Sequence, residues 1–106
     1  MEVFLSNRKG TVNAKGIYNE KEGSLIVCKG SIISTEIAGG TFRSADTVKR
    51  LRNNVEIVKG NKVVNDVVFK SPSSAANFVT GTSTNGLQAW KNKDRISLKK
   101  LLEKTE

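Results

Sequence analysis

Short alternations of apolar and polar residues occupy the first third of the chain, and they predict β-strands. Residues 3–5 form an apolar run, and in residues 11–18 every second side chain is apolar or small, which is typical of a half-buried strand. The polar segment 19–23 contains a glycine at its end and is followed by the apolar run 25–28. We therefore expect a β-hairpin, which the apolar pair 32–33 extends.

The spacing of the apolar residues becomes helical in the middle of the chain. The glycine pair 39–40 interrupts the strand pattern, and Val48, Leu51 and Val55 then follow one another at i, i+3 and i+7. This spacing places the three side chains on one face of a helix. We expect that helix over residues 44–53, with its first residue, a serine, as the N-cap.

A second hairpin is expected after this helix. The segments 56–58 (Glu-Ile-Val) and 63–64 (Val-Val) flank the turn sequence Lys-Gly-Asn-Lys, and a further apolar run at 67–69 predicts a strand that leads into the next helix.

The helix predicted over residues 71–80 has a recognisable residue at each end. Ser71 can cap its free N–H groups, and Pro72 occupies the first helical position, where a missing N–H costs nothing. Gly81 is suited to the left-handed residue that ends a helix. Apolar residues at i, i+3 and i+4 form its buried face.

The C-terminal quarter is predicted to hold a strand and a helix. An Asn-Gly dipeptide indicates a tight turn, after which we expect a short strand at 87–90. A turn at 92–94 precedes a last helix that Ser97 caps. The predicted strands and helices take up similar shares of the chain, and the strands form hairpins rather than βαβ units. We therefore expect one α+β domain over residues 1–106, with β-hairpins packed against two or three short helices.

The charge of the chain favours a polyanionic partner. The formal net charge is +8, and residues 43–106 hold thirteen of the 18 Lys and Arg but only six of the 10 Asp and Glu. A basic surface attracts nucleic acid most often, and an acidic membrane surface or an acidic protein less often. The alternative is that the charge serves solubility alone. On the helix predicted over 44–53, Lys49, Arg50 and Arg52 lie away from the apolar face.

The residue inventory argues against catalysis. The chain has no histidine, which excludes histidine-based general-base catalysis and the usual zinc sites. Asp66 and Asp94 are isolated carboxylates, so we expect no catalytic residue, metal or cofactor. The single cysteine, Cys28, is expected to be a buried, unreactive thiol and favours a reducing, cytoplasmic compartment. No apolar run reaches the roughly 18 residues that a membrane span requires.

Two features could contact a ligand, and each also has a structural interpretation. Ser71, Ser73 and Ser74 surround the positive end of a helix dipole, where a phosphate could bind; ordinary capping explains Ser71 equally well. Trp90 is expected in the core, and the alternative is a partly exposed ring that stacks on a base or a peptide.

Several motifs occur in the order typical of a known family. They are Ala14-Lys15-Gly16, Val27-Cys28-Lys29-Gly30-Ser31, Leu51-Arg52, Phe69-Lys70-Ser71-Pro72-Ser73-Ser74-Ala75-Ala76, Gly81, Asn85-Gly86, Trp90-Lys91 and Leu98-Lys99. Over about residues 3–102 the chain resembles domain-of-unknown-function family 4357. The core motif at 69–91 is also similar to the RAMA domain, the module associated with restriction enzymes and adenine methylases.

The resemblance implies a role in recognising DNA or modified DNA. Such domains typically lie at the C-terminal end of bacterial proteins, some of which carry a GIY-YIG nuclease or a methyltransferase part. The chain is therefore expected to be an accessory domain of such a system, either as a whole protein or as an excised C-terminal domain. Leu87 departs from members with Trp or Arg after Asn-Gly, which puts binding in doubt if that position contacts the ligand.

Taken together, the sequence predicts a non-catalytic domain that binds nucleic acid, with DNA favoured, in partnership with a nuclease or methyltransferase. The alternative is a protein–protein interaction module. The candidate nucleic-acid-binding residues are Arg43, Lys49, Arg50, Arg52, Ser71, Ser73, Ser74, Asn85, Lys91, Lys93 and Arg95.

Overall fold

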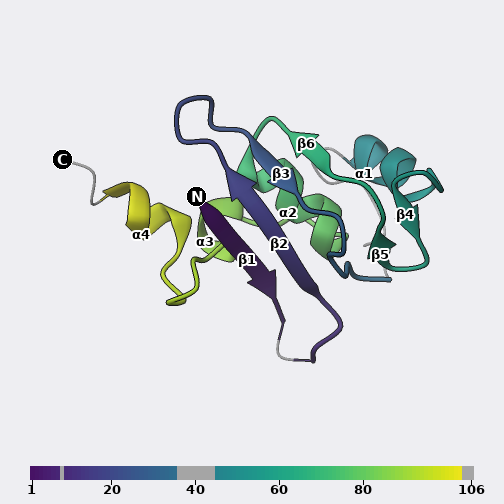
Figure 1. The fold of residues 1–106 in the computed structure, drawn as a ribbon, viewed down its shortest axis with the longest axis horizontal. Helices are drawn as coiled ribbons and strands as arrows, with labels where there is room; N and C mark the ends of the chain where they lie inside the picture. Colours follow the sequence, from purple (N-terminus) through teal and green to yellow (C-terminus); the bar gives the residue numbers. More distant parts are fainter. Residues whose placement is uncertain (8, 36–44, 104–106) are drawn as a thin grey trace.

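The structure, a computed structural model, describes residues 1–7, 9–35 and 45–103 and confirms the predicted α+β class. Its elements in chain order are β1 (Glu2–Ser6), β2 (Asn13–Tyr18), β3 (Leu25–Val27), α1 (Ala45–Arg52), β4 (Val58–Lys59), β5 (Lys62–Val63), β6 (Val67–Phe69), α2 (Pro72–Thr80), α3 (Gly86–Ala89) and α4 (Leu98–Glu103). An antiparallel sheet has the strand order β1-β2-β3-β6, and β4 and β5 form a separate small hairpin (Figure 1).

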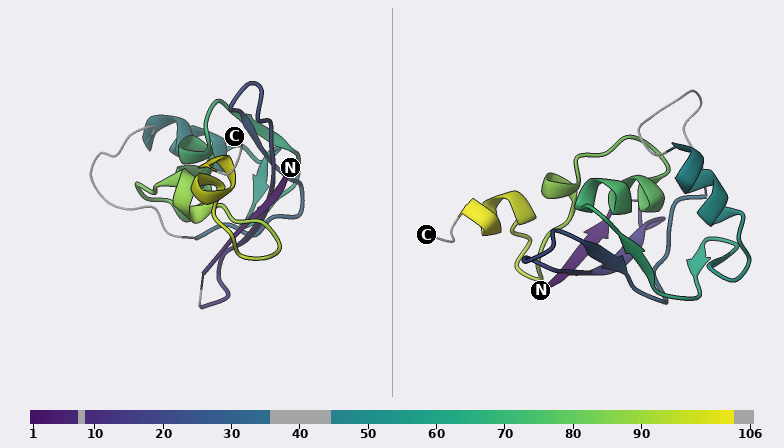
Figure 2. Two further views of the ribbon diagram at one scale, coloured as in Figure 1. Left: turned by 90° about the vertical axis from the view of Figure 1, so that its left-hand side faces the viewer. Right: turned by 90° about the horizontal axis from the view of Figure 1, so that it is seen from above.

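The four-stranded sheet has a covered face and an open face. Alternation along the strands turns Val3 and Leu5 of β1 and Leu25 and Val27 of β3 toward the core. Helices α2 and α3 lie on this side of the sheet in both views of Figure 2. No element among the described residues covers the opposite side. That open face carries Glu2, Phe4, Ser6, Asn13, Lys15, Ile17, Ile26 and Val68.

The core between the sheet and the helices is centred on two aromatic residues. Trp90 and Phe78 are completely buried, which confirms the core assignment of Trp90. The Phe78 ring lies 5.2 Å from that of Phe69, measured between centroids. A Cβ at Gly16 would lie 2.8 Å from the Leu25 side chain and 3.2 Å from the Trp90 ring. Gly16 therefore leaves the room that the indole occupies.

The predicted extension of the first hairpin beyond β3 is confirmed. The chain leaves the regular strand conformation at Gly30, and the side chain of Ser31 bonds to β2 at this point. Gly30 has a φ of +94°, which favours glycine. The Ser31 Oγ accepts from the Lys15 N–H at 3.0 Å and donates to the Lys15 carbonyl at 3.3 Å. Ile32 then pairs with Asn13 at the start of β2. The serine hydroxyl thus supplies the partner of the Lys15 N–H, while the Lys15 carbonyl also accepts from the Cys28 N–H at 2.8 Å.

Helix α1 differs from its prediction at its C-terminal end. Val48 is buried as expected, but Val55 is 68% exposed, so its assignment to the core was wrong. The helix ends at Arg52, and Val55 lies in the turn that follows, where helical spacing no longer determines which way a side chain points. The predicted cap Ser44 and the connection at 39–40 lie outside the described residues.

The β4–β5 hairpin is confirmed with a tighter turn than predicted. Val58 pairs with Val63 and Lys59 with Lys62, so the two lysines belong to the strands and only Gly60-Asn61 form the turn. Gly60 has the positive φ, +64°, that this turn requires.

The prediction of a strand at 87–90 was wrong, because residues 86–89 form the one-turn helix α3. The helical turn places Gly86 and Trp90, four residues apart, on the same side, and both contact the start of α2. Leu87 and Gln88 are exposed. Tertiary contact with α2 thus outweighs the local turn signal of Asn-Gly.

Candidate nucleic-acid interface

The serine hydroxyls at the start of α2 form internal hydrogen bonds, as in an ordinary helix cap. The Ser71 Oγ accepts from the Ser74 N–H at 3.1 Å and donates to the Ser74 Oγ at 3.0 Å. Gly81, at φ +77°, closes the other end of the helix with its N–H on the Asn77 carbonyl. The predicted N-cap, the proline at the first position and the C-terminal glycine are all confirmed.

The remaining motif residues join α2 to α3. The Ser73 Oγ accepts from the Gly86 N–H at 3.1 Å, and the Trp90 Nε1 donates to the Pro72 carbonyl at 3.0 Å. A Cβ at Gly86 would lie well inside 3.0 Å of the Pro72 and Ser73 backbone. Gly86 is therefore required by close approach, because a side chain there would push the two helices apart.

These contacts change the interpretation of the motif. Ser71, Ser73 and Ser74 were candidate phosphate or base contacts, yet each hydroxyl has an internal partner. Asn85 is exposed and makes no side-chain cap bond, while its carbonyl accepts from the N–H of Ala89. The motif residues from 71 to 90 are explained by the packing of two helices, and of the four polar candidates Asn85 is the one whose side chain makes no capping bond.

Arg52 was placed on the exposed side of its helix by spacing, and this was wrong. The guanidinium is half-buried and donates to the carbonyls of Phe78 at 2.8 and 3.1 Å, of Val79 at 3.2 Å, and of Ser34. Burial lowers the pKa of the Arg52 guanidinium from its usual value, but arginine stays charged at any physiological pH. A cation at the C-terminal end of α2 complements the helix dipole, so Arg52 acts as a structural cap.

The other candidate cations fall into two groups at opposite ends of the molecule. Lys49 and Arg50 are exposed on α1, and the segment between α3 and α4 lies at the other end of the long axis (Figure 1). A groove of about 330 Å³ beside α1 includes Arg50, Lys70 and Ser74 in its lining. Arg43 lies outside the described residues.

The segment of residues 91–95, here called the 91–95 loop, is fixed to the edge of the sheet. Lys91 forms a two-way backbone pair with Phe4, with Phe4 N–H to Lys91 carbonyl at 2.6 Å and the reverse bond at 2.9 Å. The Asn92 Oδ1 accepts from the N–H groups of Asp94 and Ile96 at 2.9 and 3.0 Å, which confirms the predicted turn. The loop therefore presents its side chains from an ordered backbone.

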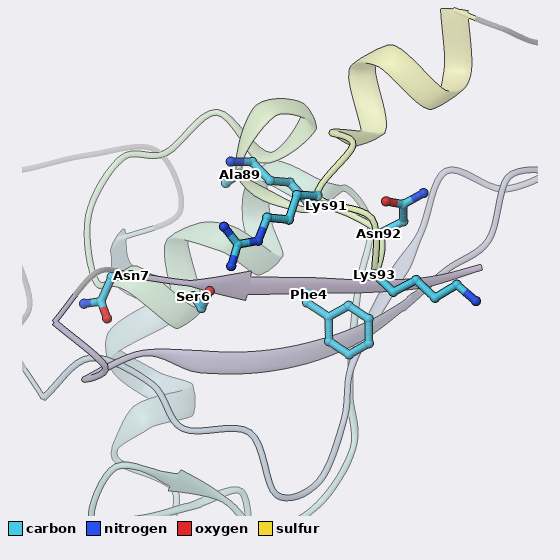
Figure 3. Close-up of a pocket in the computed structure, with 8 residues that line it drawn as sticks. Phe4, Ser6, Asn7, Ala89, Lys91, Asn92 and Lys93 are labelled. Atoms are coloured by element: carbon cyan, nitrogen blue, oxygen red, sulfur yellow. The ribbon is translucent and has the colours of Figure 1, made fainter.

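Three cations of this loop gather around one pocket. Lys91, Lys93 and Arg95 are exposed and line a pocket of about 540 Å³, together with Phe4, Ser6, Asn7, Ala89 and Asn92 (Figure 3). Among the described residues no acidic side chain lines it, although Asp94 lies in the same loop and is exposed. Arg95 has a φ of +64°, unusual for a residue other than glycine; strained backbone of this kind clusters at functional sites.

Lys91, Lys93 and Arg95 were expected from the sequence, but the aromatic residue beside them was missed. Phe4 is half-buried on the outer side of β1. The alternation of residues 2–6 could have placed its ring opposite to Val3 and Leu5. Its approach to Lys91 depends on a pairing across more than eighty residues, which local sequence does not reveal.

Two groups on the open face have shifted pKa values. A hydrogen bond to the Glu2 carboxylate, 3.1 Å away, raises the pKa of Lys15. Burial raises the pKa of the Cys28 thiol, with a smaller contribution from Asp66. We predicted a buried thiol for Cys28. Its side chain is instead half-buried, directly after β3.

The model of the family described as Domain of unknown function (DUF4357) matches residues 4–102. The chain belongs to this family. Comparison with curated proteins and with solved structures finds no match. In the part of this DUF4357 domain that the structure describes, no three or more Cys, Asp or Glu side chains lie together in a way that could hold a metal ion. The described helices are each too short or too polar to cross a bilayer.

Proposed function

We propose that this DUF4357 domain is a non-catalytic nucleic-acid-binding module, and that the 91–95 loop holds the phosphate backbone. The observation that carries the proposal is the convergence of Lys91, Lys93 and Arg95 on one pocket, which no acidic side chain lines in the part of the chain that the structure describes. Lys and Arg side chains supply most contacts to phosphate, and phosphate contacts supply most of the affinity for nucleic acid.

The arrangement of the loop favours binding over a purely solubilising role. Exposed charges that only solubilise are usually dispersed among charges of both signs. Here three cations come from five consecutive residues whose backbone is held by Asn92 and by the pair with Phe4. An ordered backbone reduces the conformational entropy that a ligand must overcome on binding.

The resemblance of the sequence motif at 69–91 to the RAMA domain supports DNA as the ligand and a nuclease or methyltransferase as the partner or parent chain. The motif residues themselves hold α2 and α3 together through the hydrogen bonds between Gly86 and Ser73 and between Trp90 and Pro72. We therefore assign ligand binding to the 91–95 loop, which follows the motif directly in the chain.

The proposal is tested by the anisotropy of a labelled oligonucleotide titrated with three proteins: wild type, the double variant Lys91→Gln/Lys93→Gln, and the matched control Lys49→Gln/Arg50→Gln. Both variants lose two positive charges from exposed positions. A charge pair at 4 Å in water contributes about 1 kcal/mol, so the loop variant should lose about 30-fold in affinity at low salt. The control should lose far less.

Equal losses in the two variants would mean that net charge alone matters and would contradict the site. If wild type binds no single strand or duplex, the protein-interaction alternative replaces the proposal.

A further inference from the structure

The open face of the sheet brings an aromatic ring into line with two lysines. Phe4 pairs with Lys15 of β2 on one side and with Lys91 on the other. Side chains of directly paired residues in antiparallel strands lie on the same face with Cβ atoms about 4.5–5.5 Å apart. The order across the sheet edge is therefore Lys91, Phe4, Lys15.

The Phe4 ring is accessible from this face. It is half-buried, lines the 540 Å³ pocket of the 91–95 loop, and lines an adjoining pocket of about 250 Å³ with Glu2, Asn92 and Lys93. Among the described residues no helix covers this side of the sheet (Figure 2). Figure 3 shows the ring beside the segment that follows α3.

We infer that the domain binds single-stranded nucleic acid, with an unpaired base stacked on the Phe4 ring and the flanking phosphates held by Lys91, Lys93 and Lys15. This inference rests on the proposed function and narrows its ligand. Proteins that bind single strands combine a cationic groove with aromatic rings on which bases stack, and both parts occur here within one pocket.

The position of the ring disfavours a duplex as the preferred ligand. Bases in a duplex are stacked on one another, so a ring reaches their faces only as a wedge that is driven between base steps. A wedge must project from the protein surface. Phe4 instead is half-buried in a concave site, which can receive a base that has already left its stack.

Lys15 already forms an ion pair with Glu2, so a phosphate must compete with this carboxylate for the lysine. The Lys15 Nζ lies 3.1 Å from the Glu2 carboxylate, and both side chains are about half-exposed. An exposed pair of this kind is worth little, so a phosphate can compete for the lysine. Glu2→Gln should therefore increase affinity, because it removes an acidic side chain from the lining of the adjoining pocket.

The test compares three probes of about ten nucleotides. This length lies within the roughly 4–16 nucleotides that one small single-strand-binding domain covers. They are oligothymidylate, an abasic strand of the same length and charge, and a duplex. We expect oligothymidylate to bind at least about fivefold more tightly than the abasic strand, since stacking of one base contributes about 1–3 kcal/mol.

Phe4→Leu keeps an apolar side chain and should remove this difference without changing affinity for the abasic strand. Phe4→Trp should preserve the difference, and its added fluorescence should be quenched by oligothymidylate but not by the abasic strand. The matched control Val68→Leu changes an exposed apolar residue on the same face, on the far strand β6, and should leave all three affinities unchanged.

Equal affinity for oligothymidylate and the abasic strand, or tighter binding of the duplex, would overturn the single-strand inference while leaving the proposed function in place. Loss of binding to every probe would overturn both. Absence of quenching in Phe4→Trp would also overturn the inference, even if Phe4→Leu fails to fold.

Discussion

Replacement of Gly86 by alanine tests whether the family motif is a packing device between two helices. The added Cβ would fall well inside 3.0 Å of the Pro72 carbonyl carbon and oxygen and of the Ser73 nitrogen. All three are backbone atoms of the first turn of α2, so no side-chain rotation can relieve the overlap. Either α2 or α3 must move.

The expected cost follows from the contacts that this movement disturbs. Overpacking of a filled site costs about 1–3 kcal/mol. The bonds from Gly86 N–H to Ser73 Oγ and from Trp90 Nε1 to the Pro72 carbonyl are each worth about 0.5–1.5 kcal/mol. The better helix propensity of alanine returns about 0.5–1 kcal/mol. Together these terms allow a net loss of unfolding free energy of about 1–5.5 kcal/mol, and we expect the middle of that range, about 2–4 kcal/mol.

Urea denaturation and thermal unfolding would measure this loss. For a domain of this size about 4–8 °C of Tm is lost for each kcal/mol, so Tm should fall by at least about 8 °C. The control is Gln88→Ala, which changes an exposed residue of the same helix and should stay within about 0.5 kcal/mol of wild type. If Gly86→Ala leaves Tm unchanged or raises it, the glycine serves only a turn and the packing argument fails.

Three further outcomes are expected. Arg52→Gln should lower the unfolding free energy by about 1.5–3 kcal/mol, because hydrogen bonds from a charged donor to the Phe78 and Val79 carbonyls are lost, whereas Arg50→Gln should not; equal urea midpoints would contradict the cap. Trp90→Phe should cost about 0.5–1.5 kcal/mol, because the buried hydrogen bond from the indole N–H to the Pro72 carbonyl is lost while that carbonyl keeps its helical partner in α2; an unchanged urea midpoint would show that the indole bond contributes nothing to stability. Alkylation of Cys28 should have its pH midpoint above that of a free cysteine peptide measured alongside, because burial favours the neutral thiol and raises its pKa; a midpoint at or below that of the peptide would refute this.

Local signals predicted most of the fold, and long-range contacts explain where they failed. Ser71, Pro72 and Gly81 define the ends of α2 through backbone chemistry that acts within a few residues, so the sequence was sufficient there. The segment at 87–90, Leu-Gln-Ala-Trp, was predicted as a strand because it follows the Asn-Gly turn signal and is too short to show a helical period. Contact with Pro72 determines its conformation, and that contact is invisible to a local pattern.

The candidate site divides in the same way. Clustering in sequence was enough to find Lys91, Lys93 and Arg95, which the structure brings to one pocket. The prediction for Arg52 was wrong because helical spacing shows on which side of α1 the side chain begins, but not that it reaches the Phe78 carbonyl of α2. Phe4 was missed since its partner lies near the other end of the chain.

The dependence of affinity on salt tests most directly whether the 91–95 loop binds phosphate. On a single strand the log–log slope is about −0.7 for each neutralised phosphate, so the three loop cations together with Lys15 predict a wild-type slope of about −2.8. Lys91→Gln/Lys93→Gln should reduce the slope to about −1.4, while Lys49→Gln/Arg50→Gln should leave it near −2.8. A loop variant that keeps the wild-type slope, with the α1 variant flattening it, would contradict the account and place the phosphate contacts at the other end of the molecule.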